Sequence, residues 1–151
     1  MKPTSTIIDK FISKKNIAVA GVSKSGKGFG HTIYNQLVDN GYNVFALNPS
    51  GGSVNGIKLY RKISDVEHPI DTIVSVVKPL VTEMLVAEAH EAGIKQFWMQ
   101  QGSESPEAIK FCEENGMSVI HGYCLLMFLE PTGFMHRFHK TILGWTNKLP
   151  V

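Results

Sequence analysis

The sequence predicts an α/β fold in which a parallel β-sheet is covered by helices. Short uncharged runs rich in β-branched residues alternate along the chain with segments whose apolar residues recur at helical spacing. Parallel strands need long crossover connections, which helices usually supply, so this alternation favours a parallel sheet over hairpins. We therefore expect right-handed crossovers, which nearly all connections of this kind have.

The elements follow from the periodicity and from the residues that begin and end helices. The predicted strands are Ile17–Ala20, Asn43–Leu47, Thr72–Val77, Gln96–Gln100 and Met117–Ile120. The predicted helices run from Thr4 or Ser5 to Ser13, from His31 to Gly41, from Pro79 to Ala92 and from Pro106 to Asn115. Proline is favoured in the first turn of a helix, where its missing N–H needs no partner, and glycine often ends one in the left-handed conformation.

The stretch from Asn16 to Gly41 organises the rest of the chain. Its first run, Ile17–Ala20, is typical of a strand buried on both faces, and an amphipathic helix begins near His31. A turn of glycine, serine and lysine, Val22–Phe29, separates the two. This glycine-rich turn after the first strand predicts a Rossmann-like domain with a five-stranded parallel sheet of order 3-2-1-4-5. Ligands then bind at the carboxyl ends of the strands.

The composition of the turn Val22–Phe29 favours a bound phosphate. Its small residues allow backbone N–H groups to approach a ligand, and Lys24 and Lys27 add positive charge beside a helix N-terminus. The glycine spacing matches neither GxGxxG nor a P-loop, because Gly26-Lys27 is followed by Gly28. An ordinary glycine-containing turn between a strand and a helix is therefore the alternative.

The composition indicates a single soluble domain spanning residues 1–151. The chain is 43% hydrophobic, and its net charge of +2 comes from scattered residues, which does not indicate a nucleic-acid surface. No apolar stretch is long enough to span a bilayer, and the N-terminus lacks the apolar core of a signal peptide. Cys112 and Cys124 lack metal-type spacing, which favours a reducing cytoplasm, although a disulfide between them stays open.

The end of the second predicted strand argues against NAD. An NAD site places an acidic side chain there to accept hydrogen bonds from the ribose hydroxyls. This chain has Asn48-Pro49 at that point and no acidic residue before Asp65. Lys58 or Arg61 could still contact an additional phosphate, so a phosphorylated dinucleotide stays open.

Four motifs in this order, GVSKSGKGFGH, FALNPSGGSVNG, SVVKP and WMQQGS, resemble the small single-domain CoA-binding proteins. That family is related to the CoA-binding domain of the succinyl-CoA synthetase alpha subunit. The resemblance covers Lys15 to Glu130 and implies a Rossmann-like fold that binds coenzyme A or an acyl-CoA. It implies that the first loop holds the CoA phosphates, the Asn-Pro loop borders the nucleotide and the third-strand loop runs along the pantetheine. The implied cofactor-binding residues are Gly21, Val22, Ser23, Lys24, Lys27, Gly30, Asn48, Pro49, Val77, Lys78 and Pro79.

The chain also matches and departs from that family at single positions. His31 matches a histidine common at the start of this helix. After the fifth predicted strand, small members have Cys-Pro with charged neighbours, and only Cys124 and Glu130 match here. The synthetases carry a phosphorylated histidine in a separate domain, for which 151 residues leave no room. The resemblance therefore implies no catalytic residue.

Several side chains have both a structural and a functional interpretation. His136 and His139 are spaced to share a metal ion but lack further ligands nearby, so we expect a solvated basic helix face and no metal site. Cys124 is expected to be an inert buried thiol, and the alternatives are a nucleophile or a thiol that pairs with CoA beside the crevice. Lys78 either contacts a phosphate or caps a strand, and Trp98 is expected in the core.

Three functions stay open on the sequence alone. The first is a module that binds CoA or an acyl-CoA without visible catalytic residues, and the second is a small NAD(P)-dependent or acyl-transferring enzyme that works with a partner chain. The third is a regulatory subunit docked through its C-terminal helix. The segment Gly133–Trp145 has an apolar stripe at helical spacing, which we expect to pack on its own sheet or on a second copy rather than in a membrane.

Overall fold

The computed structural model of the chain describes residues 5–129. The helices are α1 (Ser5–Ile12), α2 (Phe29–Asp39), α3 (Pro79–Glu91) and α4 (Pro106–Glu114), with 3₁₀ turns η1 (Ile63–Asp65) and η2 (Leu125–Phe128). The strands are β1 (Asn16–Ala20), β2 (Asn43–Leu47), β3 (Ser53–Val54), β4 (Ile57–Tyr60), β5 (Thr72–Ser75), β6 (Gln96–Met99) and β7 (Ser118–His121). The elements predicted within this range begin and end within two residues of the predicted positions.

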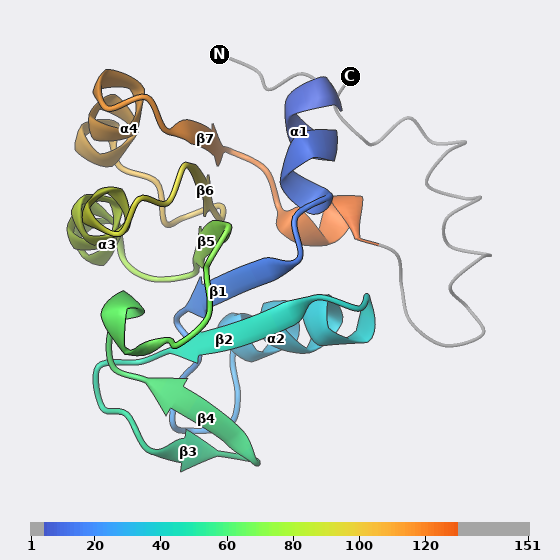
Figure 1. Cartoon of the computed structure of the whole chain (residues 1–151). Coiled ribbons are helices and arrows are strands. Elements are labelled where there is room, and N and C mark those ends of the chain that lie inside the picture. Colours follow the sequence, from blue (N-terminus) through green and yellow to red (C-terminus); the bar gives the residue numbers. More distant parts are fainter. Residues whose placement is uncertain (1–4, 130–151) are drawn as a thin grey trace.

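One sheet runs through the middle of the molecule, and helices cover both of its faces (Figure 1). Its strand order is β3-β4-β2-β1-β5-β6-β7. All neighbouring strands are parallel except β3 and β4, which form an antiparallel pair at one edge. The predicted α/β Rossmann-like fold with a mostly parallel sheet is therefore confirmed.

The predicted five-strand count and the order 3-2-1-4-5 are wrong. The sequence interpretation missed β3 and β4, which are joined by the turn Asn55-Gly56. Asn55 has a positive φ of 50°, as a tight hairpin turn requires and asparagine tolerates. β4 pairs with β2 at the place predicted for Thr72–Val77, and β5 pairs instead with the other side of β1.

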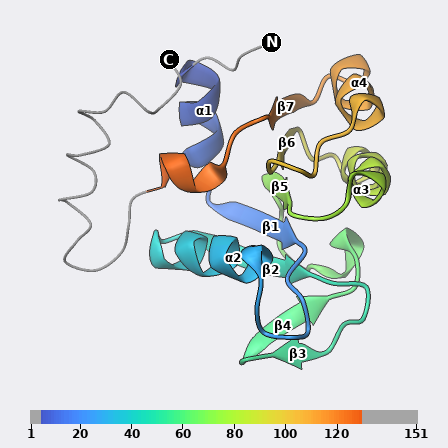
Figure 2. The ribbon, with the colours of Figure 1, turned by 180° about the vertical axis from the view of Figure 1, so that it is seen from behind.

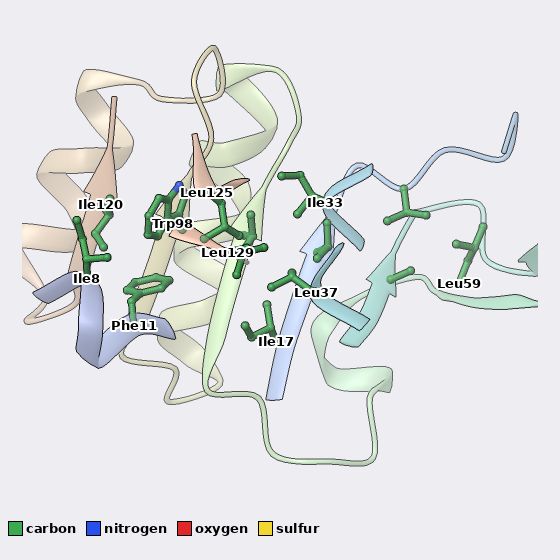
Figure 3. Packing of buried hydrophobic residues seen from close by; sticks show 14 residues of the cluster. Ile8, Phe11, Ile17, Ile33, Leu37, Leu59, Trp98, Ile120, Leu125 and Leu129 are labelled. Carbon is green, nitrogen blue, oxygen red and sulfur yellow. The ribbon is translucent and has the colours of Figure 1, made fainter. Parts of the chain in front are cut away.

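Two hydrophobic clusters, one on each face of the sheet, form the core. One cluster joins the sheet to α1, α2 and η2, and the other joins it to α3 and α4. Trp98 has no exposed surface and lies in the first cluster, with its ring centroid 5.3 Å from that of Phe11 (Figure 3). The ring centroid of Phe128 lies 5.5 Å from that of Trp98. Its indole N–H donates to the carbonyl of Tyr123 at 3.2 Å, so Trp98 is a core residue, as predicted.

Within residues 5–129, no helix has the length and apolarity that crossing a bilayer requires. The segment Gly133–Trp145, with His136 and His139, lies outside the described residues, as does Glu130. The predictions made for them stay predictions.

Candidate functional site

The carboxyl ends of β1, β2 and β5 meet at one edge of the sheet. Ala20 at the end of β1 is in register with Leu47 of β2 and with Ser75 of β5. The loops that follow these strands, 21–28, 48–52 and 76–78, are therefore neighbours. Figure 2 shows the first of them between β1 and α2, running beside the β3–β4 hairpin. The hairpin contacts this loop, since the Asn55 side-chain amide donates to the carbonyl of Gly26 at 3.5 Å.

Two glycines allow α2 to begin directly against the end of β1. Gly21 has a φ of 109°, and a Cβ there would lie 2.2 Å from the carbonyl oxygen of Val76. A Cβ on Gly30 would lie 2.1 Å from the carbonyl oxygen of Gly21. No side chain fits at either position without moving backbone, so both glycines are needed for the close approach of loop and helix.

Hydrogen bonds within the first loop, and between it and α2, fix the shape of the loop. The Ser23 hydroxyl donates to the carbonyl of Lys27 at 2.7 Å. Nε2 of His31 lies 2.7 Å from the carbonyl oxygen of Ser23, and because a carbonyl can only accept, Nε2 carries the proton. His31 is 5% exposed, so this bond ties the first turn of α2 to the loop from the interior side.

The same loop leaves donors unpaired. The N–H groups of Ser23, Lys24 and Ser25 make no hydrogen bond to any atom of residues 5–129. The N-cap of α2 is Gly28, which has no side chain to cap the first N–H groups of the helix. Lys24 and Lys27 are exposed and have no ion-pairing partner in this part of the chain. Free N–H groups, a helix N-terminus and two ammonium groups together suit an anion such as a phosphate.

Asn48 ties the loop after β2 to the first loop. Its side-chain amide donates to the carbonyl of Val22 at 3.0 Å, and its Oδ1 accepts from the backbone N–H of Ser50 at 2.8 Å. Asn48 therefore has a structural role in the site, and its predicted contact with a nucleotide stays a prediction. Where an NAD site needs a carboxylate, this chain has an amide that is already engaged by backbone atoms.

A cavity of about 130 Å³ opens between these loops and the first turns of α3. Its walls are mostly apolar, with Pro49, Val77, Val81 and Leu85 among them, and its residues are Ala20, Gly21, Leu47, Asn48, Pro49, Arg61, Lys62, Val77, Val81, Met84, Leu85 and Glu88. Of the predicted binding residues, the cavity brings together Gly21, Asn48, Pro49 and Val77. The others, Val22, Ser23, Lys24, Lys27, Gly30, Lys78 and Pro79, do not line it.

Sequence reasoning named Arg61 only as a possible contact for an additional phosphate, and it missed Lys62 and the cavity residues contributed by α3. Arg61 and Lys62 directly follow β4, so they could not be placed without that strand. The hairpin signal Asn55-Gly56 would have revealed it. Val81 and Glu88 are two helical turns apart on α3, so they lie on the same face of the helix. This face lines the cavity at the strand ends.

Larger cavities of about 420, 420 and 360 Å³ lie near the amino ends of the strands, beside residues such as Asn16, Ile70 and Gln96. They lie at the edge of the sheet opposite to the first loop. Ligands of open α/β sheets bind at the carboxyl ends, so the smaller cavity beside the first loop is the candidate site.

The remaining predicted residues have defined places. Lys78 is the exposed N-cap of α3 and Pro79 its first residue, and the N–H of Val77 donates to the Ser103 hydroxyl at 2.9 Å. Cys124 is a half-buried free thiol at the start of η2, outside the cavity lining.

The second cysteine is buried, and no metal cluster accompanies either thiol in the described part. Cys112 on α4 is also free, and burial, with a smaller contribution from a neighbouring carboxylate, raises the pKa of its thiol to about 12. No group of three or more metal-ligating side chains lies together within residues 5–129.

Comparison with known proteins gives a consistent result. The family model described as a CoA binding domain matches residues 15–130. The chain is 30% identical over 125 residues to the uncharacterized protein YneT of Bacillus subtilis, and the match covers 82% of this chain and 92% of that protein. It is also 34% identical over 87 residues to the ADP-forming acetate–CoA ligase of Methanocaldococcus jannaschii. That match covers 57% of this chain but only 12% of the ligase.

Two solved structures share the fold over most of their length. A conserved hypothetical protein from Pyrococcus furiosus has a TM-score of 0.71 and 35% identity, with 76% of this chain and 99% of that chain covered. A hypothetical protein from Pyrococcus horikoshii OT3 has a TM-score of 0.76 and 27% identity, with 94% of both chains covered.

Proposed function

This chain belongs to the CoA-binding domain family, and from that premise we propose that it binds coenzyme A or an acyl-CoA at the carboxyl ends of β1, β2 and β5. The diphosphate binds the first loop and the N-terminus of α2, and the adenine ring enters the cavity beside α3. The pantetheine leaves along the loop that contains Val77, Lys78 and Pro79, as the family resemblance implies.

The single observation that carries this proposal is the juxtaposition of unpaired donors with an apolar cavity. Free N–H groups of Ser23, Lys24 and Ser25 lie in the same loop as Gly21, which lines the cavity. A dinucleotide-like ligand needs both features side by side, because its phosphates are charged and its base is flat and largely apolar. Pockets for drug-sized ligands have volumes of ~300 Å³ or more. The cavity of about 130 Å³ is smaller, so it holds only the adenine ring and not the whole ligand.

The site favours CoA over NAD. Asn48 stands where NAD sites have a ribose-binding carboxylate, and its amide is engaged on both sides. Glu88 is a carboxylate in the cavity, but its Oε1 accepts from the backbone N–H of Ile63 at 3.0 Å. A residue held in this way supports the wall of the cavity and is poorly placed to take both ribose hydroxyls.

A second candidate function rests on the ligase match. A stretch of 87 residues is 34% identical to part of an ADP-forming acetate–CoA ligase. In such an arrangement this chain would supply the CoA site, and a partner chain would supply the catalytic residues. The two candidates share the same ligand site and differ in whether turnover requires a second protein.

Isothermal titration of the purified chain with CoA and with NAD tests the proposal. We expect CoA to bind more tightly than NAD, and native mass spectrometry to show an adduct of the mass of CoA. Tighter binding of NAD, or binding of neither ligand, would contradict it.

A further inference from the structure

We propose that Arg61 and Lys62 recognise a phosphate on the ribose of the bound nucleotide, so that the site selects 3′-phosphorylated CoA over dephospho-CoA. This inference rests on the proposed function, because it assigns one more contact to the same ligand. The group that these two residues would bind is the ribose 3′-phosphate of CoA, which NAD and ADP lack.

Arg61 and Lys62 are the two cationic side chains of the cavity lining. Both are exposed at its rim and neither makes a hydrogen bond or an ion pair with another residue of the range 5–129. The remaining ionisable group of the lining, Glu88, is bonded to the backbone of Ile63. The lining therefore carries two positive charges and one negative charge, and the Glu88 carboxylate already accepts a backbone hydrogen bond. The rim of this mostly apolar cavity has a net positive charge.

The glycine pair that follows Asn48-Pro49-Ser50 lets two of the cations converge. A Cβ on Gly51 would lie 2.8 Å from Nε of Arg61, so the guanidinium chain lies against that glycine. A Cβ on Gly52 would lie 3.0 Å from Nζ of Lys24, which reaches across from the first loop. Adjacent Cα atoms are 3.8 Å apart, so Lys24 and Arg61 approach neighbouring points of one turn from two different loops.

The order of groups around the site matches the order of groups along CoA. Lys24 belongs to the loop assigned to the diphosphate, Arg61 and Lys62 stand at the rim, and the apolar walls lie beneath them. The ribose connects the diphosphate to the base, so a ribose bound here lies between the first loop and the cavity. A phosphate on that ribose then lies at the rim, where a planar guanidinium can bind two of its oxygens.

The alternative is that Arg61 and Lys62 contact the diphosphate, with Lys24. CoA and dephospho-CoA share the diphosphate and differ in the 3′-phosphate, so the pair of ligands separates the two possibilities. Charge-assisted contacts to one phosphate commonly change affinity by tenfold or more.

The test is isothermal titration of CoA and dephospho-CoA into the parent protein, the double variant Arg61→Ala/Lys62→Ala and the control Lys58→Ala. Lys58 lies on β4, the strand that ends just before Arg61. Its Nζ lies 4.8 Å from the centroid of the Tyr60 ring, and its side chain does not line the cavity. We expect the parent and the control to bind CoA at least tenfold more tightly than dephospho-CoA. The double variant should bind both ligands with the affinity that the parent has for dephospho-CoA.

Each other result overturns a stated part of the account. Equal binding of the two ligands by the parent would remove the ribose-phosphate contact and leave the proposed function intact. Parallel loss of both ligands in the double variant would assign the two cations to the diphosphate. Absence of binding of either ligand to the parent would remove the proposed function itself. Unchanged affinity for dephospho-CoA also shows that the double variant is folded.

Discussion

Replacing Gly30 with alanine should break the contact between α2 and the end of β1. The new Cβ would lie 2.1 Å from the carbonyl oxygen of Gly21 and 2.6 Å from its carbonyl carbon. Both atoms are backbone, so the helix or the loop must move by about 1 Å to restore van der Waals distance. Overpacking of this kind costs about 1 to 3 kcal/mol, and alanine in a helix returns about 0.5 to 1 kcal/mol relative to glycine.

The shift should affect ligand binding more than folding. The net loss of about 0 to 2.5 kcal/mol lowers the melting temperature of a domain of this size by at most about 10 °C. The first N–H groups of α2 move with the helix, and charge-assisted hydrogen bonds are worth about 1.5 to 3 kcal/mol each. Losing the geometry of one of them reduces the affinity for CoA by at least tenfold.

Thermal melts and titration of CoA into Gly30→Ala and Gly41→Ala measure these effects. Gly41 is the matched control, because its φ of 89° makes alanine strained while no atom lies within 4 Å of the new Cβ. Gly41→Ala should therefore lose about 1 to 2 kcal/mol of stability and keep its affinity for CoA. The reasoning is refuted if Gly30→Ala binds CoA as the parent does, or if both variants lose affinity equally.

Three further predictions concern the loop, the core and one thiol. Lys24→Ala/Lys27→Ala should weaken CoA binding at least tenfold and reduce its salt dependence. The melting temperature should not change, because both lysines are exposed. Titrations that give the double variant the affinity of the parent would contradict this prediction. Trp98→Ala should cost about 3 to 5 kcal/mol in denaturant unfolding, since the indole is fully buried, and a loss below 1 kcal/mol would be unexpected. Burial raises the pKa of the Cys112 thiol from 9.0 to about 12, so the folded state keeps a proton that the unfolded state loses. Stability should therefore fall between pH 9 and about 12 by more than in Cys112→Ala, and equal pH profiles would refute the assignment.

The unit from β1 to α2 could be predicted because its signals are local. A change of apolar period from strand to helix, with glycines between, is visible within the stretch Asn16–Gly41. The same holds for α3, where Pro79 begins the helix as expected. Local rules of this kind need no knowledge of what the segment packs against.

The strand order could not be predicted in the same way. Strands β3 and β4 have two and four residues, which is too short for a clear alternation of apolar and polar side chains. The turn Asn55-Gly56 was a usable signal, and overlooking it moved Thr72–Val77 to the wrong side of β1. Which edge of a sheet receives a strand depends on every other strand, so one omission changed the order.

The cavity was only half predictable for a related reason. Gly21, Asn48 and Pro49 follow strand ends, and general rules of α/β sheets place such residues at a binding site. Arg61 follows the missed β4, and Glu88 comes from the third turn of a helix whose orientation is a tertiary property. Sequence distance hides the proximity of these two residues, and the fold creates it.

The location of the CoA site is tested most directly by amide chemical-shift mapping of the isotope-labelled chain during titration with CoA. We predict the largest shifts at the N–H groups of Ser23, Lys24, Ser25 and Gly30, with further changes along the cavity at Val77 and Val81. Shifts concentrated instead at the amino ends of the strands, around Lys10, Lys14 and Lys95 beside the cavity of about 420 Å³, would contradict the account.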